Sequence, residues 1–157
     1  MNASDIMTSK VVTVHPDTSV GTVARLLLDN KISAAPVIDK EDRVVGMVSE
    51  RDLLGHPSKR SLRGRWLRLF NDEAVFLEEL ATARQLTAQD VMSRRVFSVS
   101  DQAPIDVVAR LMHRHRLKRV PVLRDGKLVG IVSRADLLDA FVTRREEPAV
   151  DSLGDRG

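Results

Sequence analysis

The chain has 157 residues, of which 43% are apolar and only 3% aromatic, so it suits one compact domain or two small repeats with a core of Val, Leu, Ile, Ala and Met. It has no Cys, no signal-like apolar start and no run near the roughly 20 apolar residues of a membrane span, which excludes thiol chemistry and predicts a cytoplasmic protein without membrane contact. The net charge of +3 divides into −2 over residues 5–54, +2 over residues 55–89, +4 over residues 90–139 and −1 over residues 140–157. This basic bias is weaker than nucleic-acid binders usually carry, so small anions are the favoured ligands.

The first part of the chain predicts a β-α-β-β-α unit. The β-branched run VVTV at 11–14 is typical of a strand, and apolar residues at helical spacing predict a helix from Val20 to Asn30. The segments APVI and VVGMVS, joined by the turn DKEDR, predict two more strands. A last helix begins in SERDLL, so the unit spans residues 5–54.

Residues 55–89 form an insert unlike its surroundings. A Gly-His-Pro-Ser breaker is followed by the basic stretch KRSLRGRWLRLF and by a predicted helix near Asp72 to Arg84. Three of the five aromatic residues, Trp66, Phe70 and Phe76, lie here. We expect the insert to pack against the rest of the chain or a dimer partner, with a nucleic-acid contact or a membrane-surface patch as alternatives.

The first unit then recurs. At a shift of 85 residues, DIMTSKVVTV aligns with DVMSRRVFSV, and VARLLLDNKISAAPVI aligns with VARLMHRHRLKRVPVL. After a one-residue deletion, RVVGMVSERDLL aligns with KLVGIVSRADLL, and Asp125-Gly126 marks a tight hairpin. Because neither copy can bury both faces of its sheet alone, the predicted fold is α+β, with two copies packed as a pseudo-two-fold pair. The second copy spans residues 90–140, and we expect residues 141–157 to form a poorly ordered tail.

An S-x-x-D motif stands in each copy where the last strand passes into the last helix. One interpretation of Ser49 with Asp52, and of Ser133 with Asp136, is a helix-capping box. The other is a nucleotide site, since free N–H groups at a helix start attract phosphate and a carboxylate accepts both hydroxyls of a ribose.

Signatures of catalysis are missing from the sequence. It contains neither a phosphate-binding G-x-x-x-x-G-K-S/T loop nor G-x-G-x-x-G nor G-x-S-x-G, so we predict that the protein is not an enzyme and rank a hydrolase last. His113 and His115 point to different faces of their helix, so we predict no metal site.

The doubled pattern D-(I/V)-M, helix, P-V and G-h-V-S-x-x-D-L-L, where h is apolar, resembles a pair of CBS (cystathionine-β-synthase-type) repeats, or Bateman module. The resemblance covers about residues 5–54 and 90–138, and the insert is similar to that of bacterial CBS pairs with an appended BON domain, although we expect a stand-alone pair. It implies a homodimer of four repeats that binds AMP, ADP, ATP, NAD or S-adenosylmethionine, needs no metal and signals to a protein effector. The alternative is an interaction or nucleic-acid-binding protein that uses the basic second copy and the insert.

The resemblance also implies two clefts, each joining the S-x-x-D motif of one copy to the first strand and pre-proline loop of the other. The first would be built from Ser49, Arg51, Asp52, Met92, Phe97, Leu117, Lys118 and Arg119. The second would be built from Ser133, Arg134, Asp136, Met7, Val12, Ile32, Ser33 and Ala34. Because Lys118 and Arg119 replace Ser33 and Ala34, we expect unequal sites, with di- and triphosphates favoured in the first. The alternatives are that the cations are solvated and that the methionines belong to the core.

Overall fold

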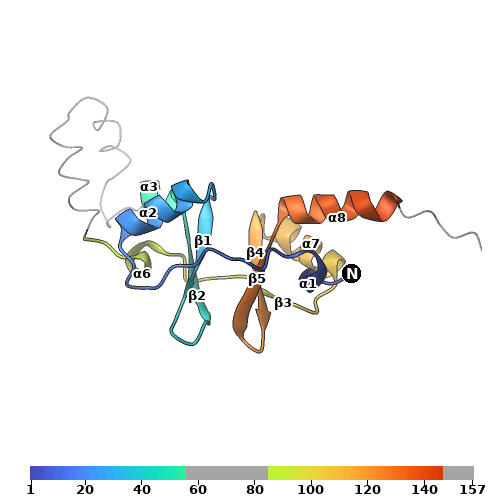
Figure 1. Ribbon diagram of the computed structural model, residues 1–157, viewed down its shortest axis with the longest axis horizontal. Coiled ribbons are helices and arrows are strands. Elements are labelled where there is room, and N and C mark those ends of the chain that lie inside the picture. Colours follow the sequence, from blue (N-terminus) through green and yellow to red (C-terminus); the bar gives the residue numbers. More distant parts are fainter. Residues whose placement is uncertain (56–84, 147–157) are drawn as a thin grey trace, which may run out of the picture.

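The computed structural model describes residues 1–55 and 85–146 and has two halves with the same order of elements (Figure 1). The first half contains α2 (Val20–Asp29), β1 (Ala34–Ile38), β2 (Val44–Ser49) and α3 (Glu50–Gly55). The second contains β3 (Val99–Ser100), α7 (Ile105–Arg114), β4 (Arg119–Arg124), β5 (Lys127–Ser133) and α8 (Arg134–Glu146). Two short helices, α1 (Ala3–Ile6) and α6 (Ala88–Val91), precede these halves in the chain.

The expected three-stranded sheet is complete only in the second half. There β3 pairs parallel to β4, and β4 pairs antiparallel to β5. In the first half β1 and β2 pair antiparallel, but VVTV supplies a single parallel bridge, from Val14 to Val37. The prediction of a strand over residues 11–14 is therefore too long, because Val11 and Val12 line a cavity instead of pairing with β1.

The two hairpins differ in their turns. Asp125 and Gly126 have φ values of 51° and 76°, as a two-residue type I′ turn requires, which confirms the predicted hairpin. The longer first turn is held by Asp39, whose carboxylate accepts hydrogen bonds of 2.9 Å from the N–H groups of Glu41 and Arg43. The Arg43 N–H bond is the main cause of the lowered pKa of Asp39. The hairpins lie side by side, since the N–H of Leu128 donates to the carbonyl of Asp42 at 3.0 Å.

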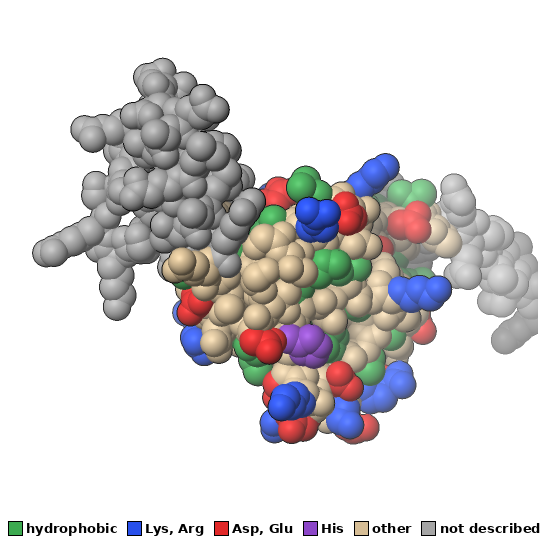
Figure 2. Space-filling view, turned by 60° about the vertical axis from the view of Figure 1, so that its left-hand side comes forward, with side chains coloured by type: hydrophobic (Ala, Val, Ile, Leu, Met, Phe, Trp, Pro, Cys, Tyr) green, Lys and Arg blue, Asp and Glu red, His purple; other side chains and the backbone are tan. Residues whose placement is uncertain are grey.

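The last helix runs further than the sequence predicts. Residues 141–146 belong to α8, although they were expected to belong to the tail. The rest of that tail (147–157), and the insert over residues 56–84 with its predicted helix and aromatic residues, lie outside the described part of the chain. Among the helices of residues 1–55 and 85–146, none has the length and apolarity needed to cross a membrane. Figure 2 shows acidic and basic side chains mixed over one face of the molecule.

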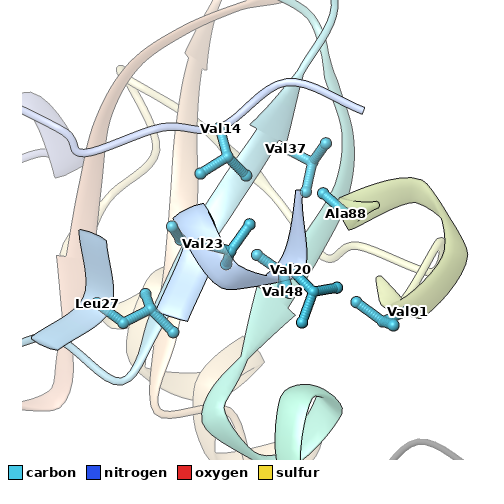
Figure 3. Packing of buried hydrophobic residues seen from close by; sticks show 9 residues of the cluster. Val14, Val20, Val23, Leu27, Val37, Val48, Ala88 and Val91 are labelled. Carbon is cyan, nitrogen blue, oxygen red and sulfur yellow. The ribbon is translucent and has the colours of Figure 1, made fainter. Parts of the chain in front are cut away.

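The short helices α1 and α6 pack on the half that they do not precede. Helix α1 contacts β5 and α8, and Ala3 is fully buried in the second core beside Val108 and Val132. Helix α6 contacts β2, and Figure 3 shows Ala88 and Val91 among the side chains of the first core. Both exchanges are seen in Figure 1, where α1 lies on the side of α7 and α8. Each core therefore includes a segment from the other sequence repeat.

Backbone pairs anchor the exchanged segments in equivalent ways. Thr8 exchanges two hydrogen bonds, of 2.9 and 3.0 Å, with Ile131 of β5. Ser93 exchanges two of 2.9 Å with Met47 of β2. Thr8 and Ser93 occupy the same position in the two repeats. The pseudo-two-fold relation predicted from the sequence therefore extends to the backbone pairs between the repeats.

Candidate functional site

A cavity of about 650 Å³ lies between the two halves. This volume falls within the range of roughly 300–1,000 Å³ that is usual for small-molecule sites. The second half contributes Arg119, Ile131, Ser133 and Asp136. The first half, with the segment after α1, contributes Thr8, Lys10, Val11, Val12, Leu27, Leu28, Lys31, Ile32, Ser33, Ala34, Pro36 and Glu50. Six residues predicted for the second cleft thus line one cavity: Val12, Ile32, Ser33, Ala34, Ser133 and Asp136.

The S-x-x-D motif forms the predicted capping box and still leaves an acceptor. Asp136 Oδ2 accepts hydrogen bonds of 2.6 Å from both the N–H and the hydroxyl of Ser133. Asp136 Oδ1 has no hydrogen-bond partner within the described residues. Asp52 and Ser49 form the same box in the first half, with distances of 2.8 and 2.9 Å. Capping therefore positions the Asp136 carboxylate at the cavity and occupies only one of its oxygens.

The cavity wall is apolar on one side and charged on another. Val11, Val12 and Ile32 provide apolar surface suited to a flat ring, and the small side chain of Ala34 leaves room beside them. Lys10 and Lys31 are exposed cations at the cavity.

Among the polar lining residues, sequence reasoning missed Thr8, Lys10, Lys31 and Glu50. Each lies within two positions of a predicted site residue, so chain proximity to those residues was the available signal. The alignment of the two copies does not distinguish these four residues from neighbours that point elsewhere. Which side chains reach the cavity depends on how the loops turn at the seam between the halves.

Arg119 lines the same cavity, to which the sequence reasoning did not assign it. Its guanidinium donates to Ser33 Oγ at 2.6 Å and to the Ala34 carbonyl at 3.3 Å, so it crosses from the second half to the first. The side chain is half-buried, and this burial lowers the pKa of Arg119. The sequence reasoning assigned Arg119 to the first cleft, with Asp52, whereas these two acceptors hold its side chain at the cavity that Asp136 lines.

Arg134 and Met7 were predicted for the second cleft but do not line the cavity. Arg134 Nε donates to the Leu117 carbonyl at 2.8 Å, and its side chain lines a separate hollow between α7 and α8. Met7 lies over Gly130, where an added Cβ would come within 2.7 Å of Met7 Cγ. Met92 lies over Gly46 in the same way and packs against the first core. Both methionines therefore serve as packing residues that need a glycine beneath them.

The other residues predicted for the first cleft lie in the segment before β4 and at the start of α3, and Phe97 lies before β3. Phe97 stacks on His115 with ring centroids 4.0 Å apart, and the Arg95 guanidinium lies 5.4 Å from the Phe97 ring. Leu117 packs against the second core, whereas Lys118 and Arg51 are exposed. The role of these residues in a nucleotide site stays a prediction.

A family model for the CBS domain matches residues 3–59 and 88–143, which cover both halves. The chain belongs to the CBS domain family. Among curated proteins, it is 35% identical over 155 residues to the protein MJ1426 of Methanocaldococcus jannaschii, covering 90% of this chain and 92% of that one. It is 30% identical to the chloroplastic CBS domain-containing protein CBSX2 of Arabidopsis thaliana, covering 85% of this chain and 60% of that protein.

Solved structures of CBS proteins share this fold. The CBS domain of a membrane protein from Sphaerobacter thermophilus matches with a TM-score of 0.72 and 35% identity, over 88% of this chain and 86% of that one. The CBS-pair protein CBSX2 matches with a TM-score of 0.74 and 27% identity, over 92% and 96%. The structure of CBSX2 in complex with AMP matches with a TM-score of 0.70 and 28% identity, over 92% and 98%. The predicted α+β fold of two tandem CBS repeats is confirmed.

Proposed function

We propose that this CBS pair is a regulatory module that binds an adenine nucleotide in the cavity between its repeats and signals its occupancy to a protein partner. The observation that carries this proposal is the convergence of Asp136, from one repeat, and the apolar surface of Val12 and Ile32, from the other, on one cavity. The AMP complex of CBSX2, a relative of the same fold, supports an adenosine ligand.

Each part of the nucleotide has a matching part of the cavity. The adenine ring would lie against Val12 and Ile32, where apolar contact favours a flat aromatic ring. The ribose hydroxyls would donate to the Asp136 carboxylate, whose Oδ1 has no other partner within the described residues. The phosphate would lie among Lys10, Lys31 and Arg119, three cations that outnumber the one other acidic lining residue, Glu50. A ligand held in this way would contact both repeats and so favour one arrangement of the pair over others.

AMP is the first candidate, and ADP, ATP and NAD share the adenosine part that the cavity would recognise. We propose binding without a resident metal and without catalysis, in a cytoplasmic homodimer.

The test is titration calorimetry of the full chain with AMP, ADP, ATP and NAD. We expect at least one of them to bind, and Asp136→Asn to weaken that binding by roughly 10- to 100-fold, since a hydrogen bond to a charged group is worth about 1.5–3 kcal/mol. The matched control is Asp106→Asn, which changes an exposed carboxylate on α7 that pairs with Arg110, and should keep the wild-type affinity. Absence of binding by all four nucleotides at millimolar concentration would contradict the proposal.

A further inference from the structure

We infer that Arg119 makes the two clefts of the pair unequal, so that each chain holds one phosphorylated nucleotide tightly, in the cavity lined by Asp136. This inference rests on the proposed function and adds the stoichiometry and the ligand class: a nucleotide with a phosphate, rather than a neutral adenosine compound. It also reverses the order expected from the sequence, in which the cleft of Asp52 was the stronger phosphate site.

The first observation is the direction of the Arg119 side chain. Arg119 begins β4 and pairs there with Ser133, yet both hydrogen bonds of its guanidinium go to Ser33 and Ala34 of the other repeat. It therefore spans the seam between the repeats and lines the cavity from there. A ligand in this cavity would meet the Arg119 guanidinium as well as the Asp136 carboxylate.

The second observation is that the positive charge of Arg119 is half-buried and has no hydrogen bond to a carboxylate in the described part of the chain. Both hydrogen-bond acceptors of the Arg119 guanidinium are neutral. The Glu50 carboxylate at the same cavity acts on the guanidinium through its charge, but no hydrogen bond or ion pair joins the two side chains in the described part of the chain. Burial has removed part of the hydration of Arg119, so an anion entering the cavity would provide the charged acceptor that it lacks. Lys10 and Lys31 are exposed and keep their water, so a phosphate gains less from them.

The third observation is the pseudo-two-fold relation. Ala34 occupies the position in the first repeat that Arg119 occupies in the second. An alanine has no donor to cross the seam in the opposite direction, so the equivalent guanidinium is missing from the cleft of Asp52. The cations predicted there, Arg51 and Lys118, are exposed and screened by solvent. The seam therefore carries an arginine that reaches the cavity of Asp136 and an alanine at the equivalent position of the other repeat.

Calorimetry with AMP and with adenosine tests this inference. We expect one tight AMP site per chain, and we expect Arg119→Ala to weaken AMP binding by roughly 10- to 100-fold while adenosine affinity changes less than about threefold. Lys127→Ala, which removes an exposed cation at the start of β5, is the matched control and should leave both affinities unchanged.

A position swap gives the sharper result. In the variant Ala34→Arg with Arg119→Ala, AMP binding should return and should now be lost with Asp52→Asn rather than with Asp136→Asn. Thermal melting checks that the chain with both substitutions is folded. If it is not folded, the inference is tested by the single variant Arg119→Ala and by the number of AMP sites per chain. Two equal AMP sites per chain, or an equal loss of AMP and adenosine in Arg119→Ala, would overturn the inference while nucleotide binding stands. Absence of any adenine ligand would overturn the proposed function itself.

Discussion

Gly46 and Gly130 show how a single atom decides the packing of an exchanged segment. At Gly46 an added Cβ would lie 2.9 Å from Met92 Cγ and 3.0 Å from the Ser93 carbonyl oxygen. At Gly130 it would lie 2.7 Å from Met7 Cγ and 3.1 Å from Met7 Cβ. These distances are shorter than carbon–carbon contacts at their optimum of about 3.5–4.0 Å. The glycine of the G-h-V-S motif is therefore a packing requirement of the methionine from the opposite repeat.

We expect Gly130→Ala to destabilise the protein by about 1–3 kcal/mol, the usual cost of overpacking a filled site. In a Met7→Ala background the same substitution should cost much less, because the side chain that it meets has been shortened. Urea unfolding of the four chains of this double-mutant cycle measures the coupling. An equal cost in both backgrounds would show that Met7 is not the residue that Gly130 accommodates.

At the scale of the elements, α1 and α6 connect the two repeats by exchange. Each is a single turn with a carboxylate cap: the Asn2 N–H donates to Asp5 at 2.6 Å, and the Thr87 N–H donates to Asp90 at 2.8 Å. Helices this short have little stability in isolation, so packing on the other repeat must hold them in place. The stability of each half therefore depends on residues that lie next to the other half in the sequence.

A chain that begins at Thr8 should lose stability in its second repeat rather than its first. The deletion removes Ala3, Ile6 and Met7 from the second core, and burial of a large apolar side chain is worth about 1.5–3 kcal/mol. Hydrogen exchange should become faster at the amides of Val120 and Val132 and stay slow at that of Val37.

The converse variant is Val91→Ala, which opens a gap of two methyl groups in the first core and should cost about 2 kcal/mol. It should speed exchange at Val37 and leave Val120 and Val132 protected. The exchanged packing would be contradicted if removal of α1 sped hydrogen exchange in the first half, or if Val91→Ala sped it in the second half.

At the scale of the whole molecule, the outer helices carry apolar side chains that the described chain does not cover. Leu138 and Val142 of α8 are 67% and 56% exposed, and Leu28 of α2 is 75% exposed. Apolar side chains gathered on helices favour association with another protein surface. These residues are where we expect the predicted homodimer to bury surface.

Leu138→Glu should shift the protein from dimer to monomer in sedimentation velocity at micromolar concentration. Two leucines are lost from a symmetric interface, each worth about 1.5–3 kcal/mol when buried, so the dimer dissociation constant should rise by a factor of roughly 100 or more. Lys127→Glu, on the hairpin of β4 and β5, is the control and should sediment like the wild type. A monomeric wild type, or a Leu138→Glu chain that remains dimeric, would remove α8 from the interface.

The sequence by itself determined the duplication, the order of helices and strands, the Asp125-Gly126 hairpin and the capped S-x-x-D helix starts. These features depend on side-chain periodicity, turn chemistry and capping, which act between residues close together in the chain. Only the tertiary structure decided that α1 and α6 exchange cores, that VVTV shortens to one bridge, and that Arg119 lines the cavity of Asp136. The physical reason is that these outcomes depend on contacts between residues far apart in the chain, such as Arg119 with Ser33 and Thr8 with Ile131. The packing of the two repeats selects these partners, and the local pattern of either repeat does not.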